Sequence, residues 1–317
     1  AFHFETGKTY QIVVETDQRG RAGLAATAIG FVFGLEADAS KGDALIAEAV
    51  ANAKDAELAI VVVGTNAQVE SEGFDRKDLK LPGRQDELVE AVLAANPNTF
   101  VVVNSGSPVL LPWRDKARAL LLTYFGGQEM GNALVDMLTG AAEPGGRLPT
   151  TWANAEADVP VLNCQHDENN QMFYTEGIHI GYRAWAKAGT KPAFAFGHGL
   201  GYTTFSTDSV TAPATLAAGE DFEVQVKVSN TGNRSGKHVV QVYASRPGSG
   251  IDRPVVWLVG FEEVHLEAGK SAVVAVPVKG REFANWDGEW KYEAGEFTLQ
   301  VCSAVDNIHH TTSVTIK

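Results

Sequence analysis

The sequence of 317 residues contains only two cysteines, Cys164 and Cys302, and they lie far apart in the chain. Such a pair provides neither the ligand spacing of a zinc site nor the framework of a disulfide-rich domain. One bridge between them stays open as an alternative, but we expect two free, buried thiols. The sequence therefore excludes functions that depend on clustered cysteines.

An excess of positive charge is also absent, because 26 Lys and Arg residues face 39 Asp and Glu residues, for a net charge of -13. A chain without a basic field does not attract phosphates, so we expect neither nucleic acid nor an anionic membrane as a partner.

Long apolar runs are missing as well. No stretch approaches the roughly 18 apolar residues that a membrane-spanning helix needs.

The start of the chain has no initiator Met and no charged segment followed by an apolar core, so we predict no signal peptide. Alternation over residues 8–16 and an apolar run over residues 28–35 predict β-strands. Two or three strands do not form a stable sheet alone, so residues 1–37 read as the tail of a β domain. We interpret the chain as a piece of a longer polypeptide. We expect it to be soluble, with secreted, periplasmic and cytoplasmic locations all open.

Residues 38–205 alternate between helix and strand patterns. Helices are predicted at 43–54, 86–95 and 127–140, and strands at 58–63, 100–104 and 119–124. Strands that alternate with helices of this length indicate an α/β domain with a mostly parallel sheet, covered by helices on both faces. After Gly140 the pattern loosens into Pro, Gly and aromatic residues up to Phe205.

Residues 206–317 change to short alternating runs separated by turn signals. The runs lie at 222–228, 239–244, 255–266, 272–278, 297–302 and 311–316. About seven short strands with regular turns are typical of an immunoglobulin-like or fibronectin-like sandwich. Within this all-β sandwich, we interpret Trp286, Asp287 and Trp290 as core and turn residues.

A loop rich in charge follows the strand at 58–63. It carries Glu70, Glu72, Asp75 and Asp78 beside Arg76 and Lys77. In open α/β sheets, ligands bind beyond the carboxyl ends of the strands. In extended backbone Glu70 and Glu72 would share one side, and like charge would raise the pKa of one of them, as an acid catalyst requires. The alternative, which spacing alone favours, is a solvated charged surface.

Four other motifs are weaker candidates. His166-Asp167-Glu168 lacks a second His at metal-ligand spacing, and His198 in a Gly-His-Gly turn suits structural hydrogen bonding. The glycine-rich segment 126–131 lacks both the dinucleotide fingerprint and the P-loop Lys, so it favours tight packing over nucleotide binding. Asn104-Ser105-Gly106-Ser107 does not match the nucleophile elbow of serine hydrolases. We therefore expect no metal and no cofactor.

An ordered set of motifs after residue 40 resembles family 3 glycoside hydrolases. The matches are Glu70-Ser71-Glu72-Gly73-Phe74-Asp75-Arg76, Leu81-Pro82-Gly83-Arg84-Gln85, Gly127-Gln128-Glu129, Pro144-Gly145-Gly146-Arg147-Leu148-Pro149, Tyr174-Thr175-Glu176-Gly177 and Phe196-Gly197-His198-Gly199-Leu200. Asn230-Thr231-Gly232 and Val240-Gln241-Val242-Tyr243 resemble that family's fibronectin-III-like domain. Residues 1–37 resemble the end of a PA14 domain, a β module that some members carry as an insertion.

The resemblance implies a retaining exo-β-glycosidase, most similar to β-glucosidases. One carboxylate attacks the anomeric carbon, and a second carboxyl protonates the leaving oxygen and then activates water. The family's acid/base aligns with Glu72, with Glu70 as runner-up. We expect Glu70, Phe74, Asp75 and Arg76 to lie next to the substrate or to hold the loop, with an ion pair between Asp75 and Arg76. The implied nucleophile belongs to an N-terminal barrel, which these residues do not contain.

Two functions from different classes follow from the sequence. In the first, the chain is the C-terminal portion of the glycosidase and is inactive without the barrel segment, which lies in the same polypeptide or a separate chain. In the second, it is a non-catalytic module that binds carbohydrate or docks to a partner. The expected ligand is a β-linked glucoside or oligosaccharide, although the identity of the sugar and homo-oligomerisation stay open.

Overall fold

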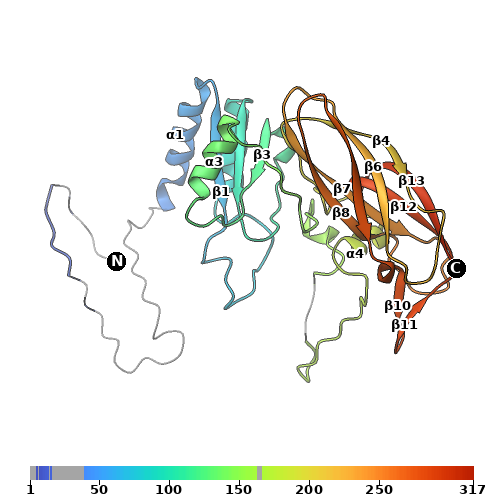
Figure 1. Ribbon diagram of the computed structural model, residues 1–317. Coiled ribbons are helices and arrows are strands. Elements are labelled where there is room, and N and C mark those ends of the chain that lie inside the picture. The colour runs from blue at the N-terminus through green and yellow to red at the C-terminus, as the bar shows by residue number, and fades with distance from the viewer. Residues whose placement is uncertain (1–4, 6, 14, 16–38, 163–165) are drawn as a thin grey trace. The chain divides into compact units, whose positions relative to one another are not determined.

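The computed structural model describes residues 5, 7–13, 15, 39–162 and 166–317, and it divides the chain into two compact units, residues 1–43 and 44–317 (Figure 1). In the first unit, the described part of the strand predicted at 8–16 has no regular secondary structure. The strand predicted at 28–35 lies outside the described residues. The PA14-like interpretation of residues 1–37 therefore stays a prediction.

A three-stranded parallel sheet forms the centre of the α/β part, with strand order β1-β2-β3. Its elements, in chain order, are α1 (Gly42–Lys54), β1 (Ala59–Gly64), α2 (Gln85–Ala95), β2 (Thr99–Asn104), β3 (Ala119–Leu122) and α3 (Met130–Thr139). The predicted α/β class with a parallel sheet is confirmed. Helix α3 begins three residues later than predicted, after Gly127, which has a φ of +70° that a helix does not accept.

The core of this part lies between β2 and α2. Val101 and Val103 on β2 and Val89 on α2 are fully buried, and Trp113 packs in the same cluster. On the other face of β2, Val102 is also buried, at 1% exposed, but the prediction that helices cover both faces is wrong at β1. There Ile60 and Val62 are 45% and 58% exposed, so one face of an uncharged, β-branched strand meets solvent.

A further helix, α4 (Tyr182–Ala188), was not predicted. It has seven residues and ends at Gly189 in the left-handed conformation. A helix of two turns has too few apolar repeats to stand out in the sequence, and it is stabilised by packing rather than by propensity. Its Trp185 and Ala184 are buried.

The all-β part confirms the predicted sandwich. Its two sheets have the orders β5-β13-β12-β7-β8 and β4-β6-β9. The strands are β4 (Phe205–Thr211), β5 (Thr215–Leu216), β6 (Phe222–Asn230), β7 (Gly236–Ser245), β8 (Trp257–Leu266), β9 (Ser271–Val278), β12 (Gly295–Ala304) and β13 (Asn307–Ile316). Alternate residues point inward, such as Val224 and Val226 from one sheet and Leu299 and Val301 from the other, and all are at most 1% exposed. The same alternation of apolar and polar residues in the sequence is what made these strands predictable.

Hydrogen bonds join the sandwich to the loops of the α/β part within the second unit. The Gln241 side chain on β7 donates to the carbonyl of Gly197 at 3.0 Å, and the amide of Leu258 on β8 donates to the Tyr182 hydroxyl at 2.9 Å. Tyr182 also stacks on Phe196, with ring centroids 4.5 Å apart. Gln241 is only 4% exposed, so its side-chain amide is buried. The hydrogen bond to Gly197 satisfies this buried polar group.

Candidate active-site loop

Three loops meet where the parallel strands end. The register pairs Gly64 of β1 with Asn104 of β2, so the segments that follow both strands leave the sheet at the same edge. The close approach requires glycine at position 64, because a Cβ there would lie 2.0 Å from the carbonyl oxygen of Asn104. The Gln85 side chain at the start of α2 bonds both the amide and the carbonyl of Gly64, at 2.7 and 2.9 Å. These contacts fix the carboxyl ends of the strands, from which the charged loop leaves the sheet.

Glu70 is held by donors from two loops. Its carboxylate accepts hydrogen bonds from the Thr65 hydroxyl at 2.5 Å, the Ser107 hydroxyl at 2.7 Å and the Gly106 amide at 3.3 Å. Burial raises the pKa of Glu70, but these hydrogen bonds and the nearby charge of Arg76 outweigh it, so the pKa lies below its ordinary value of 4.5. The surroundings of Glu70 therefore stabilise its ionised form and hold its carboxylate in place.

Glu72 occupies a different environment on a tight turn. Ser71 and Phe74 form an antiparallel bridge, and the Gly73 amide donates to the Ser71 hydroxyl at 3.3 Å, so Glu72 and Gly73 form the tip. Glu72 is exposed. The expectation of extended backbone is wrong at Glu72, which lies in the turn itself. The pKa of Glu70 is lowered, so Glu70 is not the glutamate in which like charge raises the pKa.

Arg76 connects the charged loop to the loop after β2. Its guanidinium donates to the Ser107 hydroxyl at 2.9 Å and to the carbonyl of Pro108 at 3.1 Å. The ion pair predicted between Asp75 and Arg76 is not found among the described residues, because Arg76 turns toward these oxygens instead. Asp75 is exposed, and Phe74 at the end of the turn is 47% exposed.

The hydroxyl groups that hold Glu70 were not assigned this role from the sequence. The segment 104–108 is one of the motifs that resemble family 3, but from the sequence it was weighed only as a serine nucleophile, for which it lacks the elbow. In the structure Ser107 binds Glu70, and the fully buried Ser105 donates to the carbonyl of Ser107 at 2.7 Å. Thr65 directly follows β1. Small hydroxyl residues just beyond two neighbouring parallel strands are the only signal in the sequence that points to this role.

The loop after β3 adds an aromatic ring to the same edge. A Cβ at Gly106 would lie 2.8 Å from both a Glu70 carboxylate oxygen and the Phe125 ring, so the ring and the carboxylate flank this glycine. Phe125 is 54% exposed. The preceding Tyr124 has a φ of +51°, which is costly for a residue other than glycine and is common at functional sites.

Replacing Glu70 with glutamine is expected to destabilise the chain at pH 7 by on the order of 1–2 kcal/mol, because hydrogen bonds to an ionised acceptor are stronger than those to an amide. The folded pKa lies below 4.5, so the advantage of wild type is complete above the unfolded pKa and is lost as pH falls through the folded pKa. Thermal melts of both proteins between pH 7 and pH 3 measure this. A difference in melting temperature that stays constant with pH would contradict it.

The remaining candidates have structural surroundings. Within the described ranges, no group of three or more His, Cys, Asp or Glu residues is placed to hold a metal ion, His166-Asp167-Glu168 included. His198 is half-buried, burial lowers its pKa, and its carbonyl accepts from the amide of Leu148 at 2.8 Å. Cys302 is a buried free thiol whose pKa burial raises to about 12, so it is unreactive, while Cys164 lies outside the described residues.

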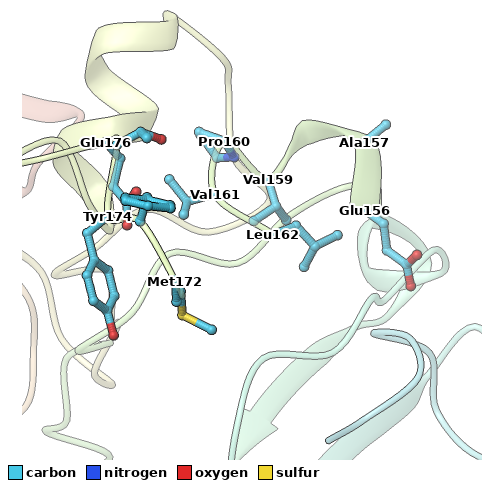
Figure 2. A pocket seen from close by; sticks show the side chains of 11 residues that line it. Glu156, Ala157, Val159, Pro160, Val161, Leu162, Met172, Tyr174 and Glu176 are labelled. Carbon is cyan, nitrogen blue, oxygen red and sulfur yellow. The ribbon is translucent and has the colours of Figure 1, made fainter. Parts of the chain in front are cut away.

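A hollow of about 500 Å³ lies between residues 156–162 and 172–176 (Figure 2). Its wall combines apolar side chains such as Val161, Leu162 and Met172 with the polar Glu156 and Glu176. Glu156 at one end accepts a hydrogen bond at 2.7 Å from the amide of Leu79, the last residue of the charged loop. Glu72 does not line the hollow. The hydrogen bond between Glu156 and Leu79 places the hollow next to the charged loop, not at Glu72 itself.

No helix in the described part of the chain is long and apolar enough to cross a membrane.

Comparisons with known proteins match both parts of the chain. The profile of the family described as "Glycosyl hydrolase family 3 C-terminal domain" matches residues 8–202, and that of the "Fibronectin type III-like domain" matches residues 238–305. A β-glucosidase of Rhizobium radiobacter is 35% identical over 314 residues, which cover 97% of this chain and 38% of that protein. The chain therefore spans well under half the length of the curated relatives it matches.

Solved structures agree with the sequence matches. The chain is similar to a β-glucosidase of Kluyveromyces marxianus, with a TM-score of 0.81 and 37% identity over 90% of this chain and 34% of the other. It is also similar to a β-glucosidase of Streptomyces venezuelae that was solved in complex with D-glucose. That match has a TM-score of 0.82 and 38% identity over 88% of this chain and 36% of the other. The chain belongs to glycosyl hydrolase family 3, of which it carries the C-terminal α/β domain and the fibronectin III-like domain.

Proposed function

We propose that this chain is the C-terminal portion of a retaining exo-β-glycosidase and that Glu72 is its general acid/base. The contrast between the two glutamates supports the choice of Glu72. Glu70 accepts three hydrogen bonds and has a lowered pKa, whereas Glu72 lies exposed at the tip of a turn. A proton donor must reach the glycosidic oxygen, and a carboxylate that is occupied by fixed donors is unsuited to that role.

In the proposed reaction, Glu72 protonates the leaving oxygen while a carboxylate attacks the anomeric carbon. The same residue then removes a proton from the water that hydrolyses the glycosyl intermediate. We place the attacking Asp on a barrel segment outside this chain, in the same polypeptide or a separate one. The relatives support this, since the chain covers 38% of the Rhizobium radiobacter enzyme. The names of these relatives, both β-glucosidases, favour a β-glucoside as substrate.

The neighbours of Glu72 have supporting roles in this proposal. Arg76 and Glu70 both bind Ser107, so together they fix the loop that carries the turn. Phe74 and Asp75 are exposed next to Glu72, and we place them beside the sugar. None of these residues supplies the proton; they orient the group that does.

The proposed domain boundaries are those predicted from the sequence. Residues 1–37 form the end of a PA14-like insertion, residues 38–205 the α/β domain and residues 206–317 the fibronectin III-like domain. The match to the family 3 C-terminal domain begins at residue 8, within the segment proposed as the insertion, so the first boundary rests on the sequence resemblance alone.

The test compares the chain alone with the longer polypeptide that includes the barrel segment. On p-nitrophenyl β-glucoside, we expect no turnover by the 317-residue chain and clear turnover by the longer protein, because one carboxyl of a two-carboxylate mechanism is not sufficient. Turnover by the chain alone would overturn the proposed missing nucleophile. An inactive longer protein would instead favour the non-catalytic module.

A further inference from the structure

Two tryptophans that the sequence placed in the sandwich core are exposed. Trp286 is 62% exposed and Trp290 is 46% exposed. They lie on β10 (Ala284–Trp286) and β11 (Trp290–Tyr292), which among the described residues pair only with each other and form a small hairpin separate from both sandwich sheets (Figure 1). The core prediction was therefore wrong for both tryptophans, while Asp287 lies in the connecting turn as predicted.

The two rings form a defined pair at the end of the hairpin. Trp286 and Trp290 are directly opposite each other in the register, with ring centroids 5.2 Å apart and planes inclined by 68°. The Arg281 guanidinium lies 4.3 Å from the centroid of the Trp290 ring. Lys291 bonds Asp287 across the turn at 2.7 Å. Arg281 thus covers part of the Trp290 ring and holds it in place, and both rings keep about half of their surface or more exposed.

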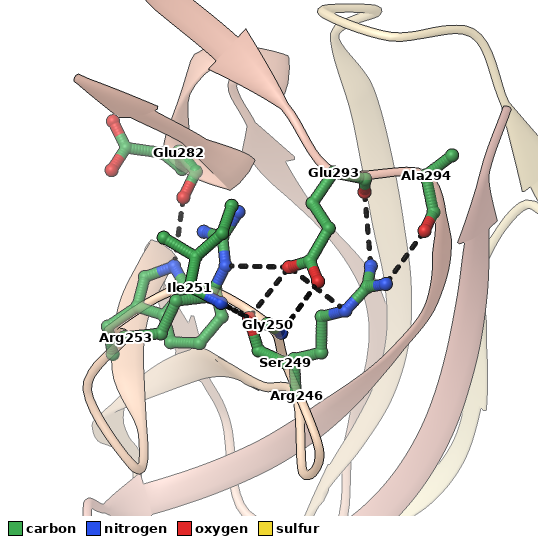
Figure 3. Close-up of polar contacts among 9 residues, drawn as sticks. Arg246, Ser249, Gly250, Ile251, Arg253, Glu282, Glu293 and Ala294 are labelled. Carbon is green, nitrogen blue, oxygen red and sulfur yellow. Dashed lines mark hydrogen bonds and ion pairs between the residues drawn. The ribbon is translucent and has the colours of Figure 1, made fainter. Parts of the chain in front are cut away.

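Both roots of the hairpin are clamped to the sandwich. Before β10, the carbonyl of Glu282 accepts a hydrogen bond from the Trp257 indole at 2.9 Å. After β11, Arg246 donates to the carbonyls of Glu293 and Ala294 at 3.0 and 2.7 Å (Figure 3). A surface that is ordered before it binds loses little entropy on binding, which favours affinity.

The Glu293 carboxylate strengthens the second root. It accepts from the Ser249 hydroxyl at 2.7 Å and from the Gly250 amide at 3.1 Å, and it pairs with Arg246 and Arg253 at 3.2 and 3.3 Å (Figure 3). The side chains of Arg253 and Glu293 are 7% and 19% exposed. Such a half-buried network resists local unfolding more than an exposed ion pair does.

The chemistry around the rings indicates the class of ligand. Two tryptophans make a patch far smaller than the roughly 800 Å² per partner of a stable protein interface. The charges near them are of both signs and almost balance, because Arg281 and Lys291 stand against Glu282, Asp287 and Glu289 in this segment, and Lys291 pairs with Asp287. A balanced surface has no preference for a charged ligand. Exposed indole faces with hydrogen-bonding groups at their edges suit the C–H faces and hydroxyls of neutral pyranose sugars.

We propose that Trp286 and Trp290 form a binding surface for neutral β-linked oligosaccharide or polysaccharide chains, separate from the loop of Glu72. β-Linked pyranoses with equatorial substituents present flat C–H faces on which indole rings stack. The surface holds a glycan chain near the enzyme and takes no part in bond cleavage. Its occupancy does not depend on the ionisation of any carboxyl group in the candidate active site.

The test is affinity gel electrophoresis of the 317-residue chain in gels that contain soluble mixed-linkage β-glucan. Wild type is expected to be retarded, and Trp286→Ala and Trp290→Ala are each expected to weaken binding by about tenfold, as for an aromatic anchor of a small interface. Trp286→Phe retains a ring and should keep part of the retardation. Phe261→Ala, which removes a ring that is 61% exposed on β8, is the matched control and should migrate as wild type does.

Thermal melts complete the design, since the hairpin lies outside both sandwich sheets and its alanine variants should melt within a few degrees of wild type. An unretarded wild type overturns the proposal. So does equal retardation of wild type and the tryptophan variants, or an equal loss in Phe261→Ala. A Glu72→Gln variant should be retarded like wild type, which separates failure of this surface from failure of the proposed acid/base.

Discussion

Replacing Glu72 with glutamine in the longer enzyme is expected to lower kcat on cellobiose by about 10²–10⁴-fold. Glutamine keeps the size of the side chain but has no proton to give to the leaving oxygen. Substrates with good leaving groups, such as dinitrophenyl glucosides, need less protonation and should lose less in the first step. Azide needs no general base to act as a nucleophile. With these substrates it should restore part of the rate, because it intercepts the glycosyl intermediate.

The control for this experiment is another acid of the same loop. Asp78 is exposed, and its carboxylate accepts a hydrogen bond from the Lys80 amide at 2.9 Å, which an asparagine oxygen can also accept. Asp78→Asn is expected to retain kcat within about twofold, since a surface substitution of this kind changes little. Wild-type turnover of cellobiose by Glu72→Gln would sink the assignment, and Glu70 would be the next residue to test.

Replacing Trp113 with alanine is expected to reduce the free energy of unfolding of the α/β part by about 3–5 kcal/mol. Trp113 is fully buried in the cluster that includes Val89 and Val101, so its removal leaves a large cavity. Its indole also donates to the Asp86 carboxylate at 2.8 Å. Burial raises the pKa of Asp86, and loss of its donor leaves a half-buried carboxylate with one partner fewer.

Urea denaturation followed by circular dichroism measures this loss as a shift of the unfolding midpoint. Trp113→Phe should fall between alanine and wild type, because it fills most of the space but cannot donate to Asp86. Trp286→Ala is the control, since that ring is 62% exposed and should change the midpoint little. Equal shifts for Trp113→Ala and Trp286→Ala would contradict the assignment of Trp113 to the core.

The fold could be predicted from the sequence because its strongest elements repeat apolar residues at regular intervals. Helix α2 has its apolar residues on one face, and β6 alternates buried and partly exposed side chains along its length. The β10–β11 hairpin could not be placed in this way. Three-residue strands with tryptophans look the same whether their rings meet the core or the solvent.

The candidate site was predictable only in part. Spacing favoured a solvated surface, and Glu72 was selected by the family resemblance. The contacts that distinguish Glu70 come from Ser107, 37 residues away, and from the Gly106 amide. They exist because two parallel strands end in register, and a pattern along one loop carries no information about its neighbour across the sheet.

Strand β1 has an open face and also lies at the edge of the parallel sheet. This position has a practical consequence for work with this chain by itself. Its six residues include no charge or proline, the features with which proteins protect the edge of a sheet. In the described part of the chain it pairs only with β2, so its outer backbone groups offer a template for strand addition. We therefore expect self-association through this edge when the chain is purified at high concentration. A lysine at position 62, where the valine is 58% exposed, is the first substitution to introduce for a monodisperse sample.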